Sequence, residues 1–135
     1  MSPAGYSGTP LPTKLGIKAE HRVLLLGAAA GFDLPELPVG VVLHRRAGTA
    51  PYDVVVAFCR DRSALERSFA ASLARTTTNG AVWVAWPKRA SGVPTDLGDD
   101  VVREYGLGHG AVDNKVCAID ETWSGLRFVR RLADR

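Results

Sequence analysis

Two tryptophans, a lysine and a serine are the residues whose positions best suit ligand binding. Trp86 and Lys88 follow the apolar run at residues 81–85, and Trp123 and Ser124 lie between two apolar segments near the C-terminus. Indole rings offer stacking surface, and an ammonium offers a point charge for phosphate or carboxylate. If the strands are parallel, all four residues reach the carboxyl edge of the sheet, where ligands bind. They predict a ligand or partner crevice. The structural alternative is that Trp86 caps the core, Trp123 anchors a hairpin and Lys88 is solvated.

Motifs for several reaction classes are absent from the sequence. It has neither the G-x-S-x-G nucleophile elbow nor the G-x-x-x-x-G-K-[ST] phosphate loop. The sequence spacing of His21, His44 and His109 does not indicate that they share a site. Cys59 and Cys117 lie in apolar runs without a C-x-x-C motif, which predicts buried, reduced thiols and no metal site.

Charged residues leave two further possibilities open. The formal net charge is +3, and only the last nine residues concentrate arginines, namely Arg127, Arg130, Arg131 and Arg135. This cluster keeps nucleic-acid binding as an alternative, although the other basic residues are scattered along the chain, which argues against a nucleic-acid partner. Asp113, Asn114 and Lys115 begin a predicted strand at the edge opposite the crevice. They could bind a ligand or form a turn with a local ion pair.

Composition indicates one globular domain. The 135 residues are 46% hydrophobic and 23% charged, which excludes a disordered tail protein. No apolar run approaches the ~18–20 residues of a bilayer span, and residues 1–12 lack the pattern of a signal peptide. We therefore expect a cytoplasmic protein without a membrane partner. We expect residues 1–13 to form an extended arm with the Tyr6 ring docked on the body of the protein. We expect residues 14–135 to form the domain.

The elements alternate as in an α/β fold. Apolar runs predict strands at residues 22–27, 40–44, 52–59 and 81–86, with the second short and at an edge. Ser63 and Glu66 form a capping-box pattern at the start of a helix, and Asn79-Gly80 predicts the turn before the fourth strand. An exposed edge at residues 40–44 would permit a homodimer as well as a monomer.

The second half predicts a helix and a hairpin. Thr95 is the expected cap of a helix that ends near Leu107. Leu11, Leu15 and Ile17 suggest a short turn or helix near the N-terminus that packs back on the body. Strands at 112–119 and 126–132 flank a turn at 120–125. The predicted fold is a single-domain α/β structure with a mostly parallel, Rossmann-like sheet of about six strands and a C-terminal antiparallel hairpin.

This pattern resembles the class I S-adenosylmethionine-dependent methyltransferases. The resemblance rests on residues 22–27 (RVLLLG), 52–56 (YDVVV) and 79–87 (NGAVWVAWP) and on the closing hairpin. It implies a cofactor loop that includes Gly27 and Gly31. The chain departs from the family pattern in this loop, where alanines replace the alternate glycines, and at residues 44–46 (HRR), where a carboxylate would hold the ribose.

At a finer level the chain resembles the small bacterial family called domain of unknown function 3052. The matching segments are residues 5–11 (GYSGTPL), 14–17 (KLGI), 86–88 (WPK), 112–116 (VDNKV) and 123–127 (WSGLR). That resemblance implies no established activity.

Together these features predict a non-catalytic, methyltransferase-like domain without a cofactor, which binds a small molecule or a protein. The alternatives are a methyltransferase that binds S-adenosylmethionine through a degenerate loop, and a basic nucleic-acid accessory protein.

Overall fold

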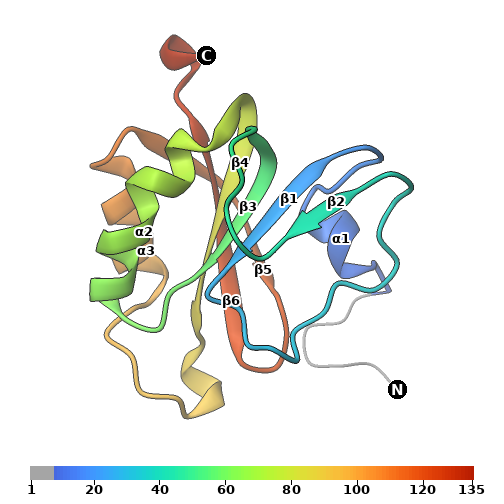
Figure 1. Cartoon of the computed structure of the whole chain (residues 1–135). Coiled ribbons are helices and arrows are strands. Elements are labelled where there is room, and N and C mark those ends of the chain that lie inside the picture. The colour runs from blue at the N-terminus through green and yellow to red at the C-terminus, as the bar shows by residue number, and fades with distance from the viewer. Residues whose placement is uncertain (1–7) are drawn as a thin grey trace.

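A six-stranded sheet with helices packed against it makes up the described part of the chain, residues 8–135, in a computed structural model (Figure 1). The strands are β1 (Arg22–Leu26), β2 (Val42–His44), β3 (Tyr52–Phe58), β4 (Thr76–Pro87), β5 (Ala111–Ala118) and β6 (Trp123–Arg130). The helices are α1 (Leu11–Lys14), α2 (Arg62–Ala74) and α3 (Asp99–Leu107), with 3-10 turns η1 (Arg89–Ser91) and η2 (Leu132–Asp134).

The strand order β2-β1-β3-β4-β6-β5 confirms the predicted sheet. The first four strands are parallel neighbours, and β6 runs antiparallel to both β4 and β5. The β5–β6 turn and η1 lie at the lower end of the sheet in Figure 1, and the chain leaves at the upper end. The lower end is thus the carboxyl edge of the parallel strands, and the upper end is the amino edge.

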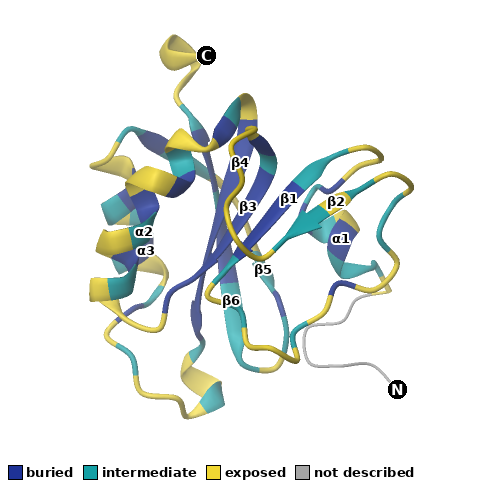
Figure 2. Ribbon diagram, in the orientation of Figure 1, coloured by how far each residue is buried: buried dark blue, intermediate teal, exposed yellow. Residues whose placement is uncertain are grey.

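The central strands are buried on both faces, as their continuous apolar runs predict (Figure 2). On one face, α2 and α3 cover the sheet, and the Phe69 ring meets the Phe128 ring edge-on at 5.4 Å. A Cβ at Gly106 would overlap the Phe128 ring, so only glycine lets α3 approach β6 this closely.

The second face is covered by the segment that follows α1 and by part of the β1–β2 connection. Leu15, Ile17 and Leu34 pack there against the sheet. The Trp83 indole N–H donates to the carbonyl oxygen of Leu15 at 2.9 Å, which fixes the segment to β4. This confirms the predicted short N-terminal helix, because α1 forms and the residues after it pack back.

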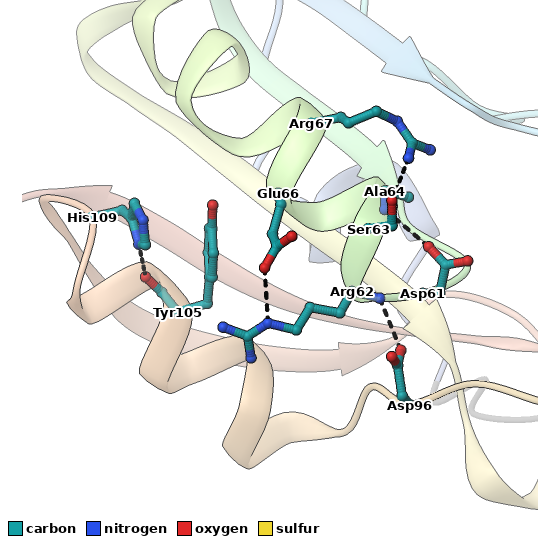
Figure 3. Close-up of polar contacts among 9 residues, drawn as sticks. All are labelled: Asp61, Arg62, Ser63, Ala64, Glu66, Arg67, Asp96, Tyr105 and His109. Atoms are coloured by element: carbon teal, nitrogen blue, oxygen red, sulfur yellow. Dashed lines mark hydrogen bonds and ion pairs between the residues drawn. The ribbon is translucent and has the colours of Figure 1, made fainter.

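The first long helix begins differently from the prediction. Asp61, and not Ser63, is the N-cap of α2, and its side chain accepts from the Ala64 N–H at 2.9 Å (Figure 3). Ser63 accepts from Arg67, and Glu66 pairs with Arg62 at 3.0 Å. The capping-box prediction is wrong because the carboxylate two residues earlier already meets the free backbone donor.

The second long helix also starts later than predicted. Its N-cap is Gly98, and Thr95 lies in the preceding turn. The Thr95 hydroxyl donates to the Arg60 carbonyl at 2.7 Å and accepts from the Leu97 N–H at 3.1 Å. Thr95 therefore holds the loop before α3 against the end of β3 and does not cap the helix.

Two predicted turns are parts of strands. Asn79 and Gly80 lie within β4, where a Cβ at Gly80 would come within 3.0 Å of the Asp53 carbonyl oxygen. Gly80 thus allows β4 to lie close to β3, next to a register shift between these two strands. The hairpin turn is shorter than predicted, because β6 already begins at Trp123. Asp120 closes it by accepting from the Thr122 and Trp123 N–H groups, each at 2.8 Å.

No helix of residues 8–135 is long and apolar enough to cross a membrane. Tyr6 and most of the predicted N-terminal arm lie outside the described residues. The division into an arm at 1–13 and a domain at 14–135 therefore stays a prediction.

Candidate functional site

The predicted crevice residues all lie at the carboxyl edge, but on different faces of the sheet. Trp86 is opposite Ser124 in the β4–β6 register, and Pro87 is opposite Trp123. Side chains alternate along a strand, so Trp86 and Ser124 face α2 and α3 while Trp123 faces the other way. The structure therefore does not bring the four residues together in one crevice. Their role in binding stays a prediction.

Trp86 has the position that the structural alternative describes, and Lys88 is partly buried. Trp86 is 5% exposed and packs in the core beneath α2 and α3. The Lys88 N–H donates to the Thr122 carbonyl at 2.8 Å and joins the end of β4 to the β5–β6 turn.

A row of aromatic rings occupies the carboxyl edge on the second face. Phe32, from the β1–β2 connection, meets the Phe58 ring edge-on at 4.9 Å between centroids. Phe58, the last residue of β3, meets the Trp123 ring edge-on at 5.1 Å. Consequently, three elements that converge at this edge are joined by their own side chains.

The loop that corresponds to the family's cofactor loop folds onto the protein. Gly27 has φ +73°, and a Cβ there would lie 2.8 Å from the Phe58 carbonyl oxygen. The Arg45 guanidinium donates to the carbonyl oxygens of Ala29 and Phe32. Gly31 is exposed, and a Cβ there would meet nothing within 4 Å. Cofactor binding by Gly27 and Gly31 stays a prediction.

The three histidines occupy separate places. His21 accepts the Lys18 N–H at 3.1 Å through Nδ1, at the amino edge. His44 Nδ1 lies 2.6 Å from the Tyr52 hydroxyl oxygen. His109 stacks on the Tyr105 ring, and its Nδ1 lies 2.7 Å from the Tyr105 carbonyl oxygen (Figure 3). These contacts orient each ring locally.

Both cysteines are free thiols; Cys59 is buried as predicted, whereas Cys117 is only partly buried. Burial raises the pKa of Cys59, and a hydrogen bond between its thiol and the Ser68 side chain only partly opposes this. Burial also raises the pKa of Cys117, against the nearby charges of Lys14 and Lys115. Residues 8–135 contain no group of three or more His, Cys, Asp or Glu side chains that could hold a metal ion.

Most C-terminal arginines bind the protein's own carbonyl groups. Arg130 donates to the Leu73 carbonyl at 2.6 Å and the Thr77 carbonyl at 2.7 Å, and thereby holds the segment that follows α2. Arg131 donates to the Leu107 carbonyl, and Arg135 to the Arg130 carbonyl. Nucleic-acid binding by this cluster stays a prediction.

A hollow of about 460 Å³ lies at the amino edge, on the second face. Its lining includes Lys14 at the end of α1, Lys18 in the segment that follows, Lys115 on β5 and Arg127 on β6. Sequence reasoning missed this group, because its members are spread over more than 100 positions and no local pattern links them.

The Asp113–Lys115 stretch is a strand with a register shift and not the turn considered above. Asp113 forms an ion pair with Arg103 at 2.9 Å, and Asn114 accepts from Arg127 at 3.2 Å. Lys115 alone of the three lines the hollow. The predicted position at the amino edge is confirmed, and the three side chains serve different neighbours.

No protein-family model and no curated protein matches the chain, so the resemblance to domain of unknown function 3052 stays a prediction. Solved structures do match. A fibrillarin pre-rRNA processing protein of Methanococcus jannaschii superposes with a TM-score of 0.57 at 12% identity, over 84% of this chain and 68% of that one.

Two further structures cover more of their own length. The N-methyltransferase NodS of Bradyrhizobium japonicum matches with a TM-score of 0.56 at 12% identity, over 89% of this chain and 91% of NodS. An rRNA methylase of Streptococcus thermophilus matches with a TM-score of 0.55 at 10% identity, over 89% of this chain and 93% of that one. The chain therefore has the Rossmann-like fold of the methyltransferases.

Proposed function

We propose that this protein is a non-catalytic, methyltransferase-like domain that acts by binding a small ligand or a protein partner. The observation that carries the proposal is the contact of Phe32 with Phe58 and of Phe58 with Trp123. In parallel α/β sheets the ligand lies outside the carboxyl ends of the strands. Here aromatic side chains of the protein occupy that place on one face.

Two features of the neighbouring loop support the same reading. Gly27 is in close contact with the Phe58 carbonyl, so this glycine serves strand packing. Arg45 lies at the end of the second strand, where the methyltransferase pattern has a carboxylate for ribose hydroxyls, and it is bonded to the loop's own carbonyls.

The second candidate is a methyltransferase that binds S-adenosylmethionine. Two observations favour it: NodS, which shares the fold, has been solved in complex with S-adenosyl-L-homocysteine, and Gly31 remains exposed in the loop.

Calorimetric titration of the full chain with S-adenosylmethionine and S-adenosylhomocysteine separates the two candidates. We expect no saturable heat at millimolar ligand. Saturable binding would overturn the non-catalytic proposal. The Gly31→Asp variant then tests the loop, because an added Cβ meets nothing within 4 Å at this position. Gly98→Asp is the matched control, since Gly98 has equal room and lies at the start of α3. Loss of binding in Gly31→Asp alone would place the cofactor on the loop.

A further inference from the structure

The hollow at the amino edge gathers cationic side chains from three separate parts of the chain. Lys14 and Lys18 come from the N-terminal segment, Lys115 from β5 and Arg127 from β6. Arg127 is opposite Trp83 in the β4–β6 register and therefore faces the same side of the sheet as that indole. The fold thus brings together cations from three parts of the chain that are far apart in the sequence.

Arg127 is half-buried at this place without a carboxylate partner among residues 8–135. Its guanidinium donates to the Asn114 side-chain oxygen at 3.2 Å. Burial lowers the pKa of Arg127, and the charge of Arg135 lowers it further. A partly desolvated cation beside further cations is a costly arrangement that an anion would relieve.

Lys14 and Lys115 both line the hollow. The charges of both lower the pKa of Cys117, a neighbouring residue on β5, against the larger effect of burial. Asp53 contributes one carboxylate to the lining, and its Oδ2 accepts from the Arg22 N–H at 2.8 Å. The lining named here therefore carries four cations against one carboxylate.

The wall that holds the two N-terminal lysines is fixed to the body. Leu15 and Ile17, between these lysines, are buried, and the Trp83 indole donates to the Leu15 carbonyl. The Lys18 N–H donates to His21 Nδ1, which places the proton of a neutral His21 ring on Nε2. A preformed wall lowers the entropy that ligand binding must overcome.

We propose that this hollow binds a small phosphate-bearing molecule through Lys14, Lys18, Lys115 and Arg127. Its volume of about 460 Å³ is within the range of small-molecule sites, which is roughly 300–1,000 Å³. Thr77, also in the lining, has a hydroxyl that can act as a neutral donor. The site is at the opposite edge from the cofactor loop, and it rests on the proposed function only in that the domain acts by binding.

Titration of the full chain with sodium pyrophosphate at low, matched ionic strength tests the proposal. We expect saturable heat, with affinity about tenfold or more weaker in Lys115→Gln and in Arg127→Gln, because each removes a charge-assisted contact. Lys115 is exposed, so its substitution leaves the fold intact. Arg89→Gln is the control, since Arg89 is exposed in η1 at the other edge. No binding, or equal loss in the control, would overturn the proposal.

Asp53→Asn adds a test that loss of structure cannot imitate. The amide oxygen can still accept from the Arg22 N–H, while the negative charge disappears. We therefore expect pyrophosphate to bind to Asp53→Asn several-fold tighter than to the parent protein. Weaker or unchanged binding to the variant would contradict the proposed site. A short oligouridine is titrated alongside, over a range of salt concentrations. If oligouridine binds tighter than pyrophosphate, and its affinity falls with salt as steeply as contacts with many phosphates require, the surface binds nucleic acid and the small-molecule proposal is overturned.

Because the adenosyl titration concerns the carboxyl edge, the outcomes are distinguishable. Adenosyl binding without pyrophosphate competition would defeat the proposed function and leave the hollow as proposed. Failure of pyrophosphate binding would defeat the hollow alone.

Discussion

Replacement of Trp83 by Phe should loosen the N-terminal segment from the sheet and reveal how firmly β4 holds it. Trp83 is fully buried, and its N–H donates to the carbonyl of Leu15, which is 1% exposed. Loss of indole packing costs about 1–2 kcal/mol. A buried carbonyl left without a donor costs a further ~1–3 kcal/mol. We therefore expect the free energy of unfolding to fall by roughly 2–5 kcal/mol in Trp83→Phe.

Trp86→Phe is the matched control for this substitution. Trp86 is 5% exposed on the same strand, and its indole N–H has no hydrogen-bond partner among residues 8–135. We expect only the packing loss of about 1–2 kcal/mol. Urea unfolding followed by circular dichroism gives both values, provided that the slope of the free energy of unfolding against urea concentration is the same in the variants and the parent protein.

The difference between the two variants isolates the hydrogen bond to Leu15. It should be ~1–3 kcal/mol, and equal losses would refute the reasoning. A second readout is pyrophosphate affinity. Because Lys14 and Lys18 flank Leu15, this affinity should fall in Trp83→Phe and remain unchanged in Trp86→Phe.

Two further predictions concern the start of α2 and the buried thiol of Cys59. Asp61→Ala should lower the free energy of unfolding by about 1 kcal/mol, because a capping carboxylate is lost, whereas Ser63→Ala should change it by less than about 0.5 kcal/mol. If urea unfolding shows a larger loss of stability in Ser63→Ala than in Asp61→Ala, Ser63 is the cap and the reasoning is refuted. Burial raises the pKa of Cys59, so above the usual thiol pKa the unfolded chain releases a proton that the folded chain keeps. Stability should therefore be intact below that range and fall as pH rises through it. Cys59→Ala should flatten this decline, and parallel pH profiles would contradict the assignment.

The sequence was most informative where burial is continuous along the chain. The runs at residues 22–27 and 52–59 predicted β1 and β3, because strands buried on both faces must be apolar throughout. The short run at 40–44 likewise predicted the edge strand β2. Each of these predictions depends on one local property, the apolar character of consecutive residues.

Local signals were less reliable where two residues competed for the same role. Asp61 and Ser63 are both good caps, and the backbone geometry at Asp61 decided between them. Asn79-Gly80 is a strong turn signal, yet β4 continues through it because Gly80 permits close contact with β3. Thr95 likewise bonds to Arg60, a residue far from it in sequence. Tertiary contacts overrode the local preference in all three cases.

By itself, the sequence determined the α/β class and the order of the strands along the chain. Tertiary structure alone decided that Phe32, Phe58 and Trp123 meet at one edge and that Lys14, Lys115 and Arg127 meet at the other. The physical reason is that apolar periodicity is imposed on neighbouring residues, whereas convergence of side chains from separate strands depends on register and packing. Charge brought together in this way leaves no pattern in the linear chain.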